Sequence, residues 1–126
     1  MADMWIRPSK NSALWMPLLN RSMHVTFAEN GQAGVNAAES LRPDLVLLDV
    51  SMPLMGGFPA ARLLNVSMPD VPIIFVTQHT DRFYVEEAFQ CGAKGYVIKR
   101  AAVTELPSAI NTVMKGQVFC SPLITS

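Results

Sequence analysis

The stretch Leu45-Val46-Leu47-Leu48-Asp49-Val50-Ser51-Met52-Pro53 decides the fold of this 126-residue chain. Four apolar residues in a row, followed by a turn signal, are typical of a strand that is buried on both faces of a parallel sheet. The strand ends in a single acid, Asp49. In open α/β sheets the carboxyl ends of the strands border the crevice where ligands bind, so Asp49 is the first candidate for a functional residue.

The composition is typical of one globular domain with a substantial core. Half of the residues (50%) are hydrophobic, and ten basic and ten acidic side chains cancel to a net charge of zero. A balanced charge gives no electrostatic signature of binding to nucleic acid or to an anionic membrane. The cysteines, Cys91 and Cys120, lie far apart in no metal-type spacing, which favours small buried thiols in a reducing cytoplasm over a disulfide framework. We therefore expect a soluble, cytoplasmic domain that contacts neither nucleic acid nor membranes directly.

Strand and helix patterns alternate on both sides of the opening stretch. Further strands are predicted over 23–28, 71–77 and 95–99, and helices over 32–41, 59–64, 81–89 and from 104 to about 114. Pro59 suits the first turn of a helix and Asp81 suits an N-cap, while Gly92 and Gly116 suit helix ends. Strands that alternate with helices form βαβ units, so we predict a doubly wound parallel α/β sheet.

Three of these strands end in polar residues of compatible chemistry, Asp49, Thr77 and Lys99. Parallel strands bring their carboxyl ends to one edge, so the three side chains should converge on one crevice. A carboxylate can attack a phosphoryl group, a hydroxyl can hydrogen-bond a phosphoryl oxygen, and an ammonium group can neutralise its charge. Taken singly, Thr77 is also explained as a strand terminus and Lys99 as a surface lysine. Together, the three residues indicate a phosphoryl-transfer site.

The segment from about Val25 to Pro122 resembles the receiver domain of bacterial two-component response regulators. Four motifs carry the resemblance: Arg42-Pro43-Asp44-Leu45-Val46-Leu47-Leu48-Asp49, Met52-Pro53 with Gly56-Gly57, Ile73-Ile74-Phe75-Val76-Thr77, and Gly92-Ala93-Lys94-Gly95-Tyr96-Val97-Ile98-Lys99. The intervals of 28 positions from Asp49 to Thr77 and 22 from Thr77 to Lys99 also agree. The lack of a proline after Lys99, and the ending Gly116–Pro122, are most similar to the NarL/FixJ-type branch. Members of that branch usually carry a helix-turn-helix DNA-binding domain after the receiver.

The resemblance implies a flavodoxin-like (CheY-like) fold, with a doubly wound five-stranded parallel sheet in the strand order 2-1-3-4-5. We expect a single receiver domain over 1–126, in which 1–22 is an atypical amino-terminal region, 23–122 is receiver-like and 123–126 is a tail. Too few residues follow Pro122 for a helix-turn-helix domain. The chain is therefore expected to be a stand-alone receiver or the front of a longer transcription regulator.

The resemblance also implies roles for the polar residues. Asp49 would be the phosphoacceptor, charged from a phosphohistidine on a sensor histidine kinase, and Thr77 and Lys99 would bind the phosphoryl group. Tyr96 falls on the family's aromatic switch position, where the ring swings inward when Thr77 is drawn to the phosphate. This movement would alter the face formed by the fourth helix, fifth strand and fifth helix, which is also the expected surface of a homodimer. An ordinary half-buried strand aromatic is the alternative explanation of Tyr96.

The family's Mg²⁺ site is only partly represented. Its expected ligands here are Asp49 and the backbone carbonyl of Ser51, but the segment Met1–Pro8 lacks the acidic pair that a receiver normally contributes. Asp3 is the acid that remains as a doubtful further ligand, and a solvated terminal acid is the simpler explanation of it. Because Mg²⁺ requires oxygen ligands and neutralises phosphoryl charge, we expect its binding to be weakened or absent.

The amino-terminal region and the loop after Thr77 also depart from the family. Pro17 interrupts the helix expected from about Asn11, at a cost of roughly 3 kcal/mol. The segment Met1–Ile6 is short and mixed for a central strand, so it pairs imperfectly, or the region is rebuilt, or a strand is swapped in from a second chain. Gln78 stands where the family often has a small residue, which would narrow access to Asp49.

Two functions therefore remain open. The first is a working receiver that accepts phosphate on Asp49 and switches a protein-interaction face. The second is a pseudo-receiver, a protein-interaction module that acts independently of phosphorylation. A phosphatase of the haloacid-dehalogenase type is disfavoured, because it needs a second acid two residues after its nucleophile and this chain has Ser51 there. We expect no enzyme activity beyond weak self-phosphorylation and dephosphorylation.

Overall fold

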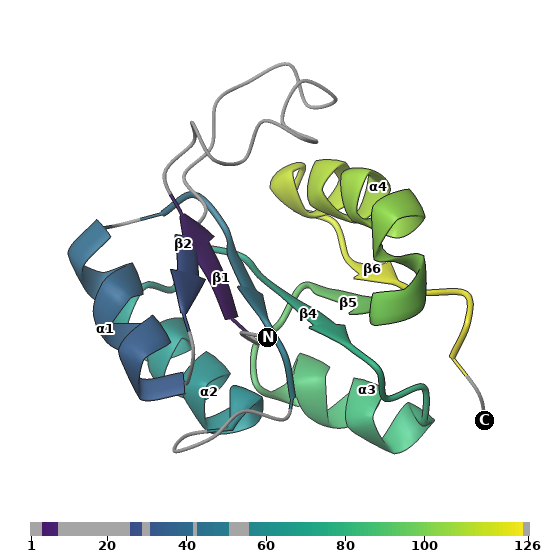
Figure 1. The fold of residues 1–126 in the computed structure, drawn as a ribbon, viewed down its shortest axis with the longest axis horizontal. Helices are drawn as coiled ribbons and strands as arrows, with labels where there is room; N and C mark the ends of the chain where they lie inside the picture. Colours follow the sequence, from purple (N-terminus) through teal and green to yellow (C-terminus); the bar gives the residue numbers. More distant parts are fainter. Residues whose placement is uncertain (1–3, 8–25, 29–30, 42, 51–55, 125–126) are drawn as a thin grey trace.

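The computed structural model describes residues 4–7, 26–28, 31–41, 43–50 and 56–124. Its strands are β1 (Met4–Arg7), β2 (Thr26–Ala28), β3 (Val46–Leu48), β4 (Ile73–Thr77), β5 (Gly95–Ile98) and β6 (Phe119–Cys120). Its α-helices are α1 (Gly31–Leu41), α2 (Gly57–Ser67), α3 (Arg82–Gln90) and α4 (Ala102–Met114). A 3₁₀ turn, Lys99–Ala101, joins β5 to α4. Figure 1 shows these elements as one sheet with helices packed against it.

The strands follow the order β2-β1-β3-β4-β5-β6 across the sheet, and β3 to β6 run parallel. The predicted doubly wound α/β class is therefore confirmed, and so is the order 2-1-3-4-5 of the first five strands. The finer prediction of five parallel strands is wrong in two details, which concern β1 and β6.

Strand β1 lies between β2 and β3, as predicted for the first strand, but it runs antiparallel to both. Met4 pairs with Leu48, Ile6 pairs with Thr26, and the register shifts between Ile6 and Arg7. Backbone donors and acceptors can complete a ladder in either direction, so a short segment carries little information about its own direction. As a result, the amino end of β1 lies at the edge of the sheet where β3 ends.

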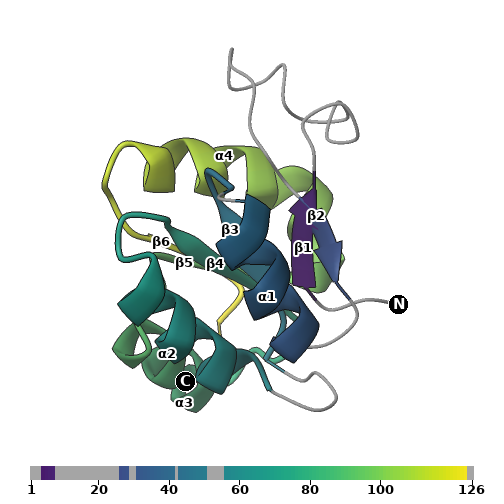
Figure 2. The same ribbon diagram turned by 90° about the vertical axis from the view of Figure 1, so that its left-hand side faces the viewer.

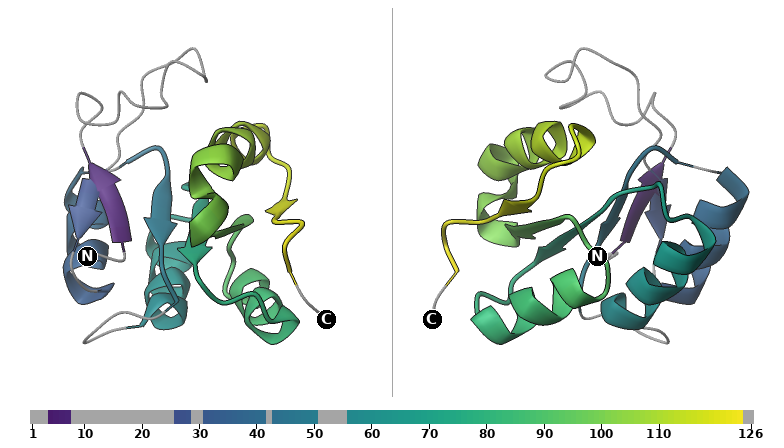
Figure 3. Two further views of the ribbon diagram at one scale, coloured as in Figure 1. Left: turned by 45° about the vertical axis from the view of Figure 1, so that its right-hand side comes forward. Right: turned by 180° about the vertical axis from the view of Figure 1, so that it is seen from behind.

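Strand β6 is a sixth strand that the sequence did not predict. Its residues Phe119 and Cys120 pair with Gly95 and Tyr96 on the outer side of β5, so β6 forms that edge of the sheet (Figure 3). The backbone N–H of Phe119 donates to the carbonyl of Lys94 at 3.0 Å. The pairing gives backbone groups of β5 protein partners on this side.

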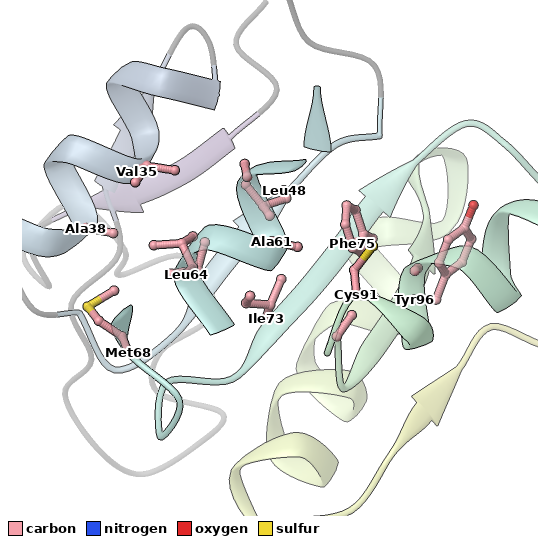
Figure 4. Close-up of a cluster of buried hydrophobic side chains, with 14 of the residues drawn as sticks. Val35, Ala38, Leu48, Ala61, Leu64, Met68, Ile73, Phe75, Cys91 and Tyr96 are labelled. Carbon is pink, nitrogen blue, oxygen red and sulfur yellow. The ribbon is translucent and has the colours of Figure 1, made fainter. Parts of the chain in front are cut away.

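Helices α1, α2 and α3 lie on one side of the sheet and α4 lies on the other (Figure 2). Side chains alternate between the two faces along each strand, so β3, β4 and β5 contribute to two cores. The core beside α1, α2 and α3 takes from these strands Val46, Leu48, Ile73, Phe75, Tyr96 and Ile98 (Figure 4). The core beside α4 takes Leu47, Ile74, Val76 and Val97. Burial on both faces explains why these strands are continuous apolar runs.

Predicted helix ends are confirmed at three positions. Asp81 is the N-cap of α3, and its carboxylate accepts a hydrogen bond from the N–H of Phe83 at 2.7 Å. Gly92 and Gly116 follow α3 and α4 with φ of 100° and 84°, a left-handed backbone that glycine adopts without a steric penalty. Local chemistry was therefore a sufficient guide to where these two helices begin or end.

Some expectations fall outside the described residues. They are the helix expected from Asn11 with its interruption at Pro17, the first half of the strand predicted over 23–28, the expected metal ligand Ser51 and the doubtful metal ligand Asp3. The expectation of two buried thiols is half right, because Cys91 is buried whereas Cys120 is exposed. Within the described part, no helix is long and apolar enough to span a membrane.

Candidate functional site

The carboxyl edge of the sheet brings two of the predicted residues into direct contact. Asp49 follows β3 and Lys99 follows β5, and Nζ of Lys99 lies 2.7 Å from Oδ2 of Asp49. The contact arises because parallel strands end at the same edge. Thr77 is the last residue of β4, the strand between β3 and β5. The topology thus delivers all three polar residues to one edge, as the sequence pattern predicted.

The two residues of the ion pair differ in burial. The side chain of Asp49 is 5% exposed, whereas that of Lys99 is 37% exposed. An isolated buried carboxylate would be costly, and pairing with a cation offsets that cost. The side chain of Lys99 is partly exposed to solvent, and its ammonium group contacts the buried carboxylate of Asp49. The site therefore combines a buried carboxylate with a cation that reaches it from the solvent.

The hydroxyl of Thr77 is held by the loop that follows β4. Thr77 is fully buried, and its Oγ1 accepts a hydrogen bond from the backbone N–H of His79 at 3.4 Å. This bond is long compared with the usual length of about 2.9 Å. A hydroxyl that accepts one bond can still donate its own proton to another acceptor. Thr77 therefore has the capacity to bind an anionic oxygen at this edge.

Tyr96 is fully buried in β5 with its hydroxyl satisfied. The hydroxyl donates to the backbone carbonyl of His79 at 2.8 Å, and the ring lies near that of Phe75, with 6.4 Å between centroids (Figure 4). Burial, and secondarily the charge of Asp49, raise the pKa of Tyr96 well above its usual range. The ring has no exposed surface, so Tyr96 is more deeply buried than the half-buried strand aromatic of the alternative explanation.

His79 is a residue that sequence reasoning missed. Its backbone links the two side chains just described, since its N–H donates to Thr77 and its carbonyl accepts from Tyr96. Its imidazole stacks on the ring of Tyr84 in α3, with centroids 4.2 Å apart and an interplanar angle of 19°. Because His79 makes both hydrogen bonds through its backbone, these two bonds require no particular residue type at the position. Only its place two residues after Thr77 could have drawn attention to it.

Gly57 explains part of a motif that the sequence left unexplained. It is the first residue of α2, and its N–H donates to the carbonyl of Val50 at 2.9 Å. A Cβ atom at this position would lie 1.9 Å from the carbonyl oxygen of Asp49 and 2.9 Å from Phe75. Only glycine allows α2 to begin so close to the backbone of Asp49.

The described residues supply part of a magnesium site. Mg²⁺ requires a near-octahedral set of oxygen ligands. Asp49 offers a carboxylate, but Oδ2 of this group is paired with Lys99. Across the described ranges, no group of three or more His, Cys, Asp or Glu residues could hold a metal ion. The described donor set therefore does not fit Mg²⁺ by itself.

A second buried polar cluster lies where the chain leaves the sheet after β6. The backbone N–H of Ser121 donates to the carbonyl of Tyr96 at 2.9 Å. Its hydroxyl donates to Oε2 of Glu105 in α4 at 2.9 Å and accepts from the N–H of Leu123 at 3.1 Å. Glu105 is buried, and its Oε1 has no hydrogen-bond partner among the described residues. The segment after β6 is thereby attached both to the strand of Tyr96 and to α4.

Comparison with known proteins places this geometry in a family context. The family model described as response regulator receiver domain matches residues 10–111. The response regulator GacA of Pseudomonas viridiflava is 39% identical over 97 residues, which are 77% of this chain and 45% of GacA. The transcriptional regulatory protein LnrK of Bacillus subtilis is 32% identical over 102 residues, or 81% of this chain and 46% of LnrK. The chain thus spans less than half the length of these curated relatives.

Solved structures give the same result. A LuxR-family two-component response regulator from Aurantimonas sp. SI85-9A1 matches with a TM-score of 0.72 and 29% identity, over 75% of this chain and 68% of that one. The response regulator domain of Thermotoga maritima CheB matches with a TM-score of 0.66 and 26% identity, over 71% and 75% of the two chains. Both matches support the α/β fold described above.

Proposed function

Because this chain belongs to the response regulator receiver domains of two-component systems, we propose that Asp49 is its phosphoacceptor and that the domain works as a phosphorylation-dependent switch. The observation that carries the proposal is the 2.7 Å contact between Lys99 Nζ and Asp49 Oδ2. An acyl phosphate forms when a carboxylate attacks phosphorus, and a preplaced cation stabilises the charge that develops on the phosphoryl oxygens. Both parts are present at one edge of the sheet.

In the proposed reaction, an oxygen of Asp49 attacks the phosphorus of a phosphohistidine on a sensor histidine kinase. The new O–P bond forms as the N–P bond breaks, and the imidazole of the kinase leaves. The ammonium group of Lys99 follows the negative charge from the carboxylate to the phosphoryl oxygens. The hydroxyl of Thr77 donates to another of these oxygens, at small cost to its bond from His79, which is already 3.4 Å long.

We further propose that Tyr96 reports the state of Thr77. Both residues bond to the peptide of His79, so a shift of that loop changes the position available to the Tyr96 hydroxyl. The stack of His79 on Tyr84 passes the shift to α3. The bond from Ser121 to the carbonyl of Tyr96 passes it to the segment after β6. These contacts support a switch whose output is a changed protein-interaction face.

Receiver domains generally bind Mg²⁺, which neutralises phosphoryl charge during transfer. We propose that this chain binds the ion weakly. Asp49 and the backbone carbonyl of Ser51 would hold it, with Asp3 as the remaining acid. The lack of an acidic pair in Met1–Pro8 supports this proposal, since fewer charged oxygen ligands mean lower affinity. Met4, the residue after Asp3, pairs with Leu48, the residue before Asp49, which supports Asp3 as the additional metal ligand.

The proposed partners are proteins. Response regulators receive their signals from sensor histidine kinases, and we propose such a kinase, in the cytoplasm, as the phosphate source. A second copy of the chain would bind over the family's fourth helix, fifth strand and fifth helix, which are α3, β5 and α4 here. Because β6 covers the outer side of β5, this surface would consist of α3, β6 and α4, with Phe83 and Val118 exposed on it. Relatives named transcriptional regulatory proteins support a role in transcription, which does not require this domain to touch DNA.

Phosphorylation by acetyl phosphate with Mg²⁺, followed by intact-mass measurement, tests the proposal. Wild type should gain the mass of one phosphoryl group, and Asp49→Ala should not. Asp44→Ala is a matched control, because Asp44 precedes β3 at the opposite edge of the sheet. A wild type that gains no mass at any Mg²⁺ concentration would refute phosphorylation. It would support instead the alternative, a phosphorylation-independent pseudo-receiver that acts as a protein-interaction module.

A further inference from the structure

A hollow of about 390 Å³ lies at the carboxyl edge of the sheet, directly beside the proposed phosphorylation site. Its lining among the described residues consists of Gln78, Ile98, Lys99 and Arg100. We call it the Arg100 hollow. Lys99 belongs both to this hollow and to the ion pair with Asp49, so the two sites share one side chain. Anything that binds in the hollow therefore lies next to the proposed nucleophile.

The described part of the lining is cationic. Of the four described residues that line the hollow, two carry a positive charge, the amide of Gln78 can donate, and none is an acid. A concave surface lined by one sign of charge raises the local concentration of ligands of the opposite sign. The chemistry of the lining therefore favours an anion, and a phosphate group in particular, because guanidinium and ammonium groups both bind phosphate oxygens.

Arg100 is the lining residue that is available to such a ligand. The ammonium group of Lys99 is on Asp49, whereas the guanidinium of Arg100 makes no hydrogen bond or ion pair with any residue in the described ranges. The 3₁₀ turn Lys99–Ala101 fixes the backbone of Arg100 immediately after β5. A guanidinium presents a rigid fork of donors that can engage two phosphate oxygens together.

We propose that the Arg100 hollow captures small acyl phosphates with two negative charges, and that Arg100 sets the preference of the domain among small phosphodonors. The proposal rests on the proposed function of Asp49. In the transfer itself, an oxygen of Asp49 forms the new bond to phosphorus, the bond from phosphorus to the acyl oxygen breaks, and the carboxylate of the donor leaves. Arg100 acts before this step by holding the dianionic phosphate beside Lys99.

The preference is tested by phosphorylation rates with two donors, acetyl phosphate and the less charged phosphoramidate. Arg100→Gln should slow the reaction with acetyl phosphate by roughly fivefold and that with phosphoramidate by less than about twofold, because electrostatic attraction scales with the charge of the donor. The difference should shrink at high salt, which screens exposed charges. Arg100→Lys, which keeps the charge, should restore most of the rate.

Lys115→Gln is the control, since Lys115 is an exposed cation beyond the end of α4 and the substitution changes net charge equally. It should leave both rates unchanged. Equal slowing of both donors by Arg100→Gln, or the same selective loss in Lys115→Gln, would overturn the proposal.

A binding measurement separates this proposal from the proposed function. Inorganic phosphate is titrated into wild type, Asp49→Ala and Arg100→Gln, and the backbone amide signals of Gln78 and Arg100 are followed by NMR. Asp49→Ala should bind phosphate more tightly than wild type, because Lys99 is released from its carboxylate, and Arg100→Gln should bind more weakly. If the variants show this pattern but wild type is not phosphorylated by acetyl phosphate, phosphate binding in the Arg100 hollow is retained. The proposed role of Asp49 as phosphoacceptor is then refuted. If the signals of Gln78 and Arg100 do not respond to phosphate in wild type and in Asp49→Ala, the proposal that the Arg100 hollow binds phosphate is overturned.

Discussion

Gly57 and Asp49 approach each other so closely that a Cβ on Gly57 would lie 1.9 Å from the carbonyl oxygen of Asp49. Gly57→Ala should therefore force α2 and the end of β3 apart. We expect a loss of about 3 kcal/mol in the free energy of unfolding, as for other overpacked positions. Urea denaturation measures the loss, and the rate of phosphorylation should fall with it because the proposed phosphoacceptor Asp49 is displaced.

The neighbouring glycine provides the control for this substitution. A Cβ on Gly56 would meet nothing closer than the carbonyl oxygen of Val50, at 3.5 Å. Gly56→Ala should change the free energy of unfolding by less than about 1 kcal/mol. Equal losses in the two variants would contradict the prediction. They would show that any loss of glycine in this segment lowers the free energy of unfolding, whether or not the residue lies close to Asp49.

The pair of Asp49 and Lys99 should behave as a coupled unit. Lys99→Met leaves the carboxylate of Asp49 buried without this cation, and we expect a loss of about 1–2 kcal/mol, moderated by the partial exposure of Lys99. Adding Asp49→Asn to Lys99→Met should recover part of the loss. A double-mutant cycle by denaturation measures the coupling. Additive losses from the two substitutions would contradict it.

The polar cluster after β6 makes a similar prediction in a different place. Ser121→Ala removes the hydroxyl that donates to Glu105, and both carboxylate oxygens then lack a partner among the described residues. We expect a loss of about 2 kcal/mol, and a smaller loss when Glu105→Met is added, because two apolar partners leave nothing unsatisfied. Ser108→Ala, on the exposed side of α4, should be near neutral. A double variant less stable than Ser121→Ala would contradict the account.

Tyr96 should make the stability of the domain decrease at alkaline pH. Since burial and the charge of Asp49 raise the pKa of Tyr96, the folded protein keeps the phenol proton at a pH where the unfolded chain releases it. The resulting stability is complete below the pKa of an unfolded tyrosine, about 10, and decreases as the pH rises above it. Urea denaturation across this pH range should show that the difference in the free energy of unfolding between wild type and Tyr96→Phe decreases as the pH rises. Tyr84→Phe should follow wild type, and parallel profiles of wild type and Tyr96→Phe would contradict the prediction.

Much of this structure was accessible from the sequence because its signals are local. An apolar run fixes β3, a side-chain acceptor fixes the start of α3 at Asp81, and parallel βαβ topology then places Asp49 and Lys99 at one edge without any knowledge of their distance. Each of these inferences uses a pattern of neighbouring residues or a general rule of connection.

What the sequence did not reveal depends on contacts between distant residues. The bond between Ser121 and Glu105 joins two ordinary polar residues, and nothing in either neighbourhood marks them as partners. The direction of β1 is decided by pairing with other strands, and the role of His79 belongs to its backbone. Strand β6 has only two residues, too few for any periodicity.

The short strand β6 has a consequence for how the protein behaves among its own copies. A long open strand at the edge of a sheet can template the pairing of further chains and so start aggregation. Here the buried apolar strand β5 is covered by two residues, and Pro122, which has no backbone N–H to offer, follows within two positions of Cys120. The sheet therefore presents little backbone on this side to which another molecule could add a strand, and its most aggregation-prone segment is kept inside the fold.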